Sequence, residues 1–374
     1  MDLSREDSLR LHVLLKQDLQ AVRIDESAMV LHALTGEGEA RVPLNPTCRD
    51  EIYLRKVREL LSTHVLGSPG GYPVYLRRWT RMGQARADNL DRLLLLGEPE
   101  AVVAVVHAEG LTDELARRAW WAMPTAENAR RMLEHEHIAR GSMGPELAAF
   151  LLEFLPFEED SRAIVDSVRL VLQPGLVDEA TRDKLWKRAR QKTTYYTGFL
   201  WALPDDLPDP LPAHPALEAA APRLQPLADS GNPVAALLLR VLGAPGQTFV
   251  HVAREALRKP RDQDVTVILF DVVGGYFGGV RHLMPESQDL ADLERAADAL
   301  VESRAGALAA VLEAAPELAP QAAAVLLMSR VGEPLLRPIF ARTDAIGTVM
   351  RRKLEPLTGP IDRRMACLLA AGAA

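Results

Sequence analysis

Glycine and proline residues divide the middle of this chain into helical segments that start at similar intervals, although the third segment is longer. Each unit follows a glycine and closes at a proline, over residues 110–124, 144–156 and 175–204, so the glycines lie 34 and 31 positions apart. Helix-pair repeats have periods of roughly 30 to 47 residues, and the pairs stack because one pair alone cannot bury its apolar face. The spacing therefore predicts a mainly α protein built as a stacked helix-pair array, an α-solenoid of the HEAT-like kind.

The composition also favours helices over sheets. Of the 374 residues, 48% are apolar and only 5% are aromatic, and alanine and leucine are plentiful. Unbranched side chains such as these lose little rotamer freedom in a helix. The formal net charge of −7 favours solubility and opposes broad, non-specific attraction to polyanions. Any surface that binds nucleic acid must therefore be local.

The N-terminal part of the chain predicts a small sheet ahead of the helical bulk. After a short helical start, runs suited to β-strands are separated by the turn signals DES at 25–27 and GEG at 36–38. Thr47 is placed to cap the helix that follows, in which apolar residues recur at helical spacing. We expect an antiparallel meander and this helix to form a small N-terminal α/β cap and junction over residues 1–86.

A change in composition divides the helical part in two. Residues 204–215 read PDDLPDPLPAHP, with five prolines, three aspartates and almost nothing to pack. Such a stretch is typical of a linker. We therefore predict a helical repeat region over residues 87–204, a proline-rich linker over 205–215 and a C-terminal helical region over 216–374.

The stretch LGSPGGYPVYLRRWTRMG at 66–83 combines glycines, prolines, aromatic rings and arginines. Its glycines match neither the Walker spacing nor GxGxxG, so a nucleotide cradle is not indicated. Gly67 would end the preceding helix, which makes the stretch a junction first of all. In one interpretation, its rings and cations form an interaction surface that extends to Arg86. In the other, the rings pack the cap onto the first helix of the array, and the guanidinium groups pair with nearby acids or face water. The candidate residues are Tyr72, Tyr75, Arg77, Arg78, Trp79, Arg81 and Arg86.

A second basic run, DKLWKRARQKTTYY at 183–196, repeats this mixture. It adds Trp186, Lys187 and Arg188 to the candidate interaction surface. If the two runs share one face, an acidic protein or RNA would bind there. A solvated helix face is the simpler interpretation, because no RNA-binding signature can be read in the sequence.

The two cysteines, Cys48 and Cys367, lie far apart and indicate neither a disulfide framework nor a zinc motif. Cys48 lies between Thr47 and Arg49, where helix-start amides and a cation would stabilise a thiolate. It is the candidate thiol for sulfur transfer or redox sensing, although a lone cysteine is more often a small buried hydrophobe. Cys367 is expected to belong to the core.

No catalytic or metal-binding constellation can be assembled from the sequence. His135 and His137 lie two positions apart, which on a regular helix turns them about 200° from each other, so they do not chelate one ion. No Ser-His-Asp, Cys-His or paired-carboxylate set can be placed. We therefore expect no catalytic residues, no metal and no cofactor.

The ends and apolar runs of the chain bear on its location. The start, MDLSREDSLR, is charged and lacks the layout of a signal peptide. The apolar run VTVILFDVVGGYFGGV at 265–280 is short for a membrane span and contains Asp271. We expect a cytoplasmic protein without a membrane partner.

Three stretches of the sequence resemble the DsrS family, which is encoded with the dissimilatory sulfur-oxidation (dsr) genes of sulfur-oxidising bacteria. They are MDLSREDSLR, LNPTCRDEIYLRKVRELLSTHVLGSPGGYPVYLRRWTRMGQ at 44–84, and the later LLLLGEPEAVVAVVHAEGLTDELARRAWWAMPTAENARRMLE. The likeness is strongest over about the first 200 residues and rests on overall wording, not on a chemically diagnostic motif. It implies a soluble cytoplasmic accessory protein of sulfur-globule oxidation with no assigned catalytic residues, no known cofactor and a suggested influence on production of dsr components.

The sequence features and the resemblance to the DsrS family favour the same function. We expect a non-catalytic accessory or regulatory interaction protein of dissimilatory sulfur oxidation, whose partners are other proteins of that system. Stacked helices suit this role because they present extended surfaces without needing chemistry. Two alternatives stay open: a cytoplasmic sulfur carrier or sulfur/redox sensor that uses Cys48, and an RNA-binding helical scaffold.

Overall fold

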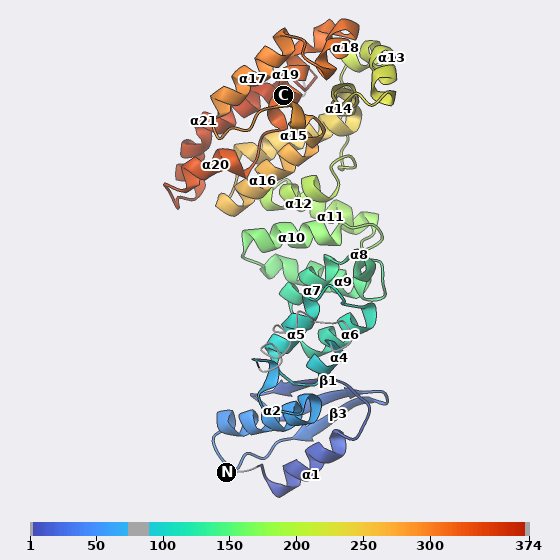
Figure 1. Ribbon diagram of the computed structural model, residues 1–374, viewed down its shortest axis with the longest axis vertical. Helices are drawn as coiled ribbons and strands as arrows, with labels where there is room; N and C mark the ends of the chain where they lie inside the picture. Colours follow the sequence, from blue (N-terminus) through green and yellow to red (C-terminus); the bar gives the residue numbers. More distant parts are fainter. Residues whose placement is uncertain (1–2, 74–89, 371–374) are drawn as a thin grey trace. The chain divides into compact units, whose positions relative to one another are not determined.

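The computed structural model describes residues 3–73 and 90–370 of the chain. Helices make up most of it, and a three-stranded sheet lies near the N-terminus (Figure 1). The chain divides into two compact units, Met1–Phe154 and Leu155–Ala374. The prediction of a mainly α protein with a small N-terminal α/β cap is confirmed.

The cap consists of a helix, an antiparallel meander and a second helix. Helix α1 (Arg5–Leu14) is followed by β1 (Leu19–Asp25), β2 (Val30–Thr35) and β3 (Gly38–Pro43), and then by α2 (Asp50–Leu66). Strand β2 lies in the middle of the sheet and pairs antiparallel with both neighbours. The predicted meander and its two turns are therefore present.

One core joins the two helices of the cap to its sheet. Leu11, Leu31 and Tyr53 come from α1, β2 and α2 and are buried together. Asp7 of α1 is also fully buried. Its carboxylate accepts a hydrogen bond from the Tyr53 hydroxyl at 2.5 Å and one from the backbone N–H of Asn45 at 2.6 Å. These bonds tie α2 and the chain beyond β3 to α1.

The start of α2 differs from the prediction that Thr47 caps it. The helix begins at Asp50, and Arg49 occupies the N-cap position without a side-chain capping bond. Asp50 and Glu51 instead bring negative charge to the first turn, where the helix dipole favours it. The other end agrees with the sequence: Gly67 ends α2 in the left-handed conformation, with φ at 71°, which glycine adopts without steric cost.

Short helices complete the first unit, and one of them starts earlier than the glycine pattern suggests. Gly144 lies inside the first turn of its helix instead of before it. The carboxylate of Asp113 accepts hydrogen bonds from the backbone N–H groups of Ser142 and Met143, and so satisfies amides at the helix start. The helices are α4 (Leu90–Leu93), α5 (Pro99–Val106), α6 (Asp113–Ala122), α7 (Ala126–Leu133), α8 (Glu136–Ala139) and α9 (Met143–Phe154).

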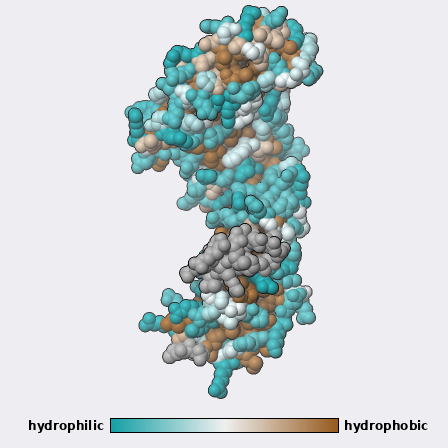
Figure 2. All heavy atoms as spheres, viewed as in Figure 1, coloured by the Kyte–Doolittle hydropathy of each residue, from teal (hydrophilic) through white to brown (hydrophobic). Residues whose placement is uncertain are grey.

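The described part of the second unit consists of helices and the segments that join them. On the face drawn in Figure 2, its hydrophobic residues lie in separate patches among hydrophilic ones. The α-helices are α10 (Ser161–Val171), α11 (Glu179–Ala189), α12 (Thr193–Ala202), α13 (Ala216–Asp229), α14 (Pro233–Leu242), α15 (Ala244–Arg258), α16 (Gln263–Tyr276), α17 (Leu290–Glu302), α18 (Ala307–Ala314), α19 (Ala319–Met328), α20 (Glu333–Phe340) and α21 (Gly347–Ala366). Short 3-10 turns are η2 (Leu155–Phe157), η3 (Gly278–Leu283) and η4 (Pro316–Leu318).

Helices of the second unit stack on one another in pairs. Helix α12 packs against both α15 and α16, which pack in turn against α21 and α20 (Figure 1). Neighbouring pairs thus share the apolar surface that one pair alone would expose. Helices α10 and α12 approach each other closely, and a Cβ on Gly198 would lie 2.7 Å from the Cβ of Val168. Only glycine fits there without moving a helix.

Residues 205–215, predicted to be a linker with little to pack, are tied to the helices of the second unit. Leu207 is buried, and the backbone N–H of His214 donates to the carbonyl of Leu242 at 2.8 Å. We call residues 205–215 the strap. Because the two units meet in sequence between residues 154 and 155, the strap lies within one unit. The predicted domain boundaries stay predictions.

Within the described residues, no single helix combines the length and the apolar character that a membrane span requires. Two bent pairs of helices meet the length and composition conditions only when taken together. One pair is α14 with α15, bent by 77°, and the other is α18 with Pro316–Met328, bent by 118°.

Candidate interaction surface

The structure describes the first candidate stretch only in part. Tyr72 is half-buried, and its backbone N–H donates to the carboxylate of Glu98 at 2.9 Å. Burial raises the pKa of the Glu98 carboxyl, and the bond from Tyr72 offsets part of that rise. This contact joins the end of the cap to the start of α5. The other candidates in this stretch lie outside the described residues: Tyr75, Arg77, Arg78, Trp79, Arg81 and Arg86.

The two cysteines lie in different environments, and only Cys367 is contrary to its expected place in the core. Helix α2 begins at Asp50, so Cys48 does not receive the helix-start amides that the prediction assumed. Its side chain is partly buried and packs against the core of the cap. Cys367, expected in the core, is exposed, and its thiol donates to the carbonyl of Arg363 at 3.3 Å. The reactivity of Cys48 stays a prediction.

The second candidate stretch forms α11, and its tryptophan is buried. Trp186 is 5% exposed and meets Phe199 of α12 edge to face, with the ring centroids 5.0 Å apart. Its indole N–H donates to the carboxylate of Asp209 in the strap at 2.7 Å. Lys187 and Arg188 are exposed. In this conformation the two cations face solvent, but the Trp186 ring is not free to stack on a base.

The strap supplies carboxylates to arginines on the helices around it. The pairs are Asp205–Arg240, Asp206–Arg182 and Asp209–Arg190. A hydrogen bond from Arg190, followed by the one from Trp186, holds the pKa of Asp209 below its ordinary value. The basic face of α11 that carries Arg182 and Arg190 is therefore neutralised from within the chain.

Arg240 of α14 connects the strap to a pair of stacked aromatic rings. It donates two hydrogen bonds to Asp205, at 2.8 and 2.6 Å, and its Cζ lies 3.9 Å from the centroid of the Tyr276 ring. Tyr276 stacks on Phe249 at 3.8 Å between centroids. Burial raises the pKa of Tyr276 although Arg240 opposes the rise. The bidentate pair and the cation–π contact fix this guanidinium in place.

An open groove of about 540 Å³ runs along α16 beside this cluster. That volume lies in the range of roughly 300 to 1,000 Å³ found for binding sites. Residues of α16 form its apolar floor, the end of α12 forms one wall, and α10 contributes a cation. We call it the α12–α16 groove, and the residues that define it are Arg162, Trp201, Asp264, Val267, Ile268 and Val272.

The charged and aromatic side chains of the groove differ in how they are held. Trp201 is 42% exposed, and the guanidinium of Arg169 lies over its ring at 4.4 Å from the centroid. Asp271 accepts a hydrogen bond from the backbone N–H at the start of α20, at 2.8 Å. Arg162 and Asp264 are exposed and form no ion pair with any residue that the structure describes. The groove therefore offers a fixed ring and two uncommitted charges.

Sequence reasoning missed this groove because its parts converge from distant positions. Arg162, Trp201 and Ile268 belong to α10, α12 and α16, which the contacts among these helices bring together. The one local signal is the apolar run at 265–280, whose length and composition bear first on a membrane span. Its spacing of aliphatic residues, interrupted by Asp271, is what an exposed apolar helix face requires.

The histidine pair and its surroundings hold no metal cluster in the described part of the chain. Within residues 3–73 and 90–370, no group of three or more His, Cys, Asp or Glu side chains is arranged to hold an ion. The ring of His137 donates to the carbonyl of Leu111 at 2.6 Å. Burial, followed by the charge of Arg131, lowers the pKa of His135.

Comparison with known proteins does not assign a function to the groove. No family model, no curated protein and no solved structure matches the chain. The groove and the resemblance of the sequence to the DsrS family are therefore the two observations that bear on function.

Proposed function

We propose that this chain is a non-catalytic accessory or regulatory protein of dissimilatory sulfur oxidation, as its resemblance to DsrS implies. It acts by binding another protein of that system through the α12–α16 groove. The observation that carries the proposal is the groove itself, with an apolar floor open to solvent and charged groups at its edges. Contact sites between proteins combine an apolar centre with a polar rim in this way.

The exposed apolar residues of the groove support a role in binding. Val267, Ile268 and Val272 are only partly buried, whereas a surface helix normally turns polar residues outward. Tryptophan is among the residue types most enriched at binding hot spots. Because Arg169 already holds the ring of Trp201, a partner would lose little side-chain entropy in using it.

Affinity purification of the full chain from cells that grow on reduced sulfur tests this function. The wild type is compared with Trp201→Ala, and circular dichroism confirms that the variant is folded. We expect proteins of the sulfur-oxidation system to co-purify with the wild type. Recovery with Trp201→Ala should fall about tenfold, as for the loss of a hot-spot residue. Purifications that return neither proteins nor transcripts of that system contradict the proposal.

RNA binding is a second candidate, favoured by one observation on α11. Lys184, Lys187 and Arg188 are exposed and form no ion pair with a described residue. Binding of single-stranded RNA at this stripe would weaken steeply with salt, and Lys187→Ala with Arg188→Ala would reduce it. Salt-independent binding, or none at low salt, excludes this candidate.

A further inference from the structure

One face of α16 combines aliphatic and acidic side chains and is open along most of the helix. Residues on this face follow the i, i+3, i+4, i+7 spacing of a single helix side, from Asp264 through Val267, Ile268, Asp271 and Val272. The pattern ends at Gly275, where an added Cβ would have no atom within 4 Å. At 1.5 Å per residue the face is about 16 Å long, or three helical turns.

The exposed charged side chains on this face of α16 are the carboxylates of Asp264 and Asp271. Asp264 forms no ion pair with a described residue, and Asp271 accepts a bond from a backbone N–H, not from a cation. Arg240 is already paired with the strap, and the exposed Arg162, which also lines the groove, belongs to α10 and not to α16. The two carboxylates on this α16 face repel phosphate groups and attract Lys or Arg side chains. The net charge of −7 steers a basic partner in the same direction.

The walls of the groove decide the conformation of the partner. They consist of helices, whose backbone groups are already paired within each helix. An extended peptide laid in the groove would take its own N–H and C=O groups from water without gaining partners. A helix keeps those bonds internal and presents an apolar stripe to the floor.

We infer that the α12–α16 groove binds a basic amphipathic helix, about three turns long, from a partner protein. This inference rests on the proposed function and names the chemistry of its partner. The apolar stripe of that helix lies against Val267, Ile268 and Trp201, and a Lys or Arg lies beside Asp264.

Fluorescence anisotropy with labelled peptides tests the inference on the full chain. The probe is an amphipathic peptide of Leu and Lys, about 15 residues long, because shorter isolated helices are marginal in water. One reference peptide has the same residues in scrambled order, and a second has Glu in place of Lys. We expect saturable binding of the probe and binding about tenfold weaker for both references. Equal binding of all three peptides contradicts the inference.

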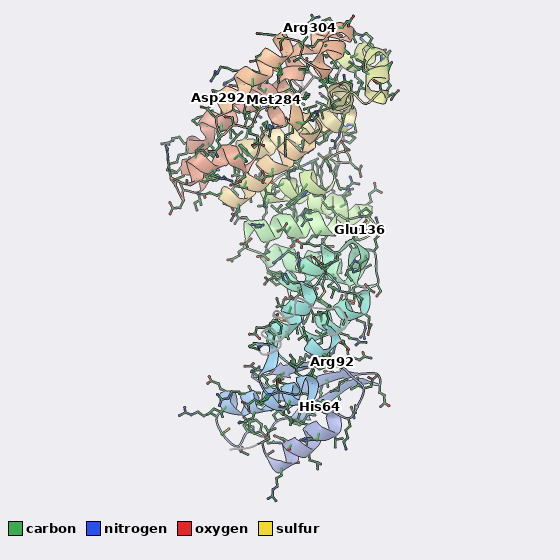
Figure 3. All side chains as sticks on the ribbon, in the orientation of Figure 1. His64, Arg92, Glu136, Met284, Asp292 and Arg304 are labelled. Carbon is green, nitrogen blue, oxygen red and sulfur yellow. The ribbon has the colours of Figure 1, made fainter. Side chains whose placement is uncertain are left out.

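A charge reversal at Asp264 identifies the groove as the place of binding. Asp264→Lys should weaken the basic peptide about tenfold and favour the Glu peptide. The matched control is Asp292→Lys, because Asp292 lies in the first turn of α17 (Figure 3) and is not among the residues that line the groove. Both changes put a cation at a helix N-terminus, but only the first alters the groove. Ile268→Ala, which removes floor surface without a charge, should also weaken the probe.

The outcomes separate this inference from the proposed function. Equal effects of Asp264→Lys and Asp292→Lys contradict the inference, and so does RNA that displaces the probe. If the peptides behave as expected but purification recovers no sulfur-oxidation protein, the helix-binding groove stands and the proposed function fails. If Asp264→Lys recovers those proteins as well as the wild type does, the proposed function stands and the inference fails.

Discussion

Asp7 shows how the cap accommodates a buried charge. Burial alone would raise the pKa of its carboxyl, but hydrogen bonds from Tyr53 and Asn45 outweigh burial and bring the pKa below its ordinary value. A carboxyl with a lowered pKa in the folded state stabilises the fold above its unfolded pKa, near 3.9. That stability is lost as the pH falls through the folded pKa. The cap should therefore weaken in acid.

Tyr53→Phe tests the bond between α1 and α2. The change removes a donor to a buried carboxylate, so we expect a loss of about 1–3 kcal/mol in the free energy of unfolding at pH 7. The loss should persist down to about pH 4 and shrink below it, as Asp7 becomes protonated. Urea unfolding of both proteins across this pH range measures it. A penalty of the same size at pH 3 and pH 7 contradicts the assignment.

The two thiols should differ in reactivity because they differ in exposure. Cys367 is exposed and Cys48 is partly buried, so we expect iodoacetamide to label Cys367 several-fold faster. Peptide mass spectrometry after timed labelling measures both rates. The sulfur-carrier alternative requires a different result: a sulfane donor must add about 32 Da at Cys48, and Cys48→Ser must lose that adduct.

At the scale of elements, local signals predicted helices and turns but not their partners. The meander and the end of α2 at Gly67 follow from turn residues and a left-handed glycine. Helix α2 has Arg49, not Thr47, at its N-cap position, a shift of two residues that is typical of helix boundaries read from sequence. The strap could not be recognised, because its arginine partners lie on α11 and α14.

Asp209 tests whether the strap is part of the fold. Asp209→Ala leaves the buried Trp186 N–H without its acceptor and puts alanine at a φ of 56°. We expect a loss of about 1–2 kcal/mol in the free energy of unfolding and faster proteolysis within residues 205–215. Asp209→Asn keeps an acceptor and tolerates this φ, so its loss should be smaller. Cleavage of the wild-type strap at the rate of an open linker would contradict this account.

At the scale of the whole molecule, periodicity and composition indicated the helical fold but not the binding groove. The glycine and proline spacing predicted stacked helices, because each helical segment has an apolar face that it can bury only against a neighbour. The α12–α16 groove could not be predicted from the sequence, since it forms where Arg162, Trp201 and Ile268 come together. Those residues are separated in sequence, and their exposure depends on packing. The candidate surface chosen from charge and aromatic content instead includes a buried ring, Trp186.

The central claim is that the groove contacts a protein of sulfur oxidation, and site-specific photo-crosslinking tests it most directly. A photoreactive phenylalanine analogue replaces Trp201 in the full chain, and the control carries it at exposed Glu302, outside the groove. Cells growing on reduced sulfur are irradiated, and adducts are identified by mass spectrometry. The account predicts an adduct at position 201 with a protein of the sulfur-oxidation system, and none at position 302. Absence of any adduct at 201, or the same adducts from both positions, would contradict it.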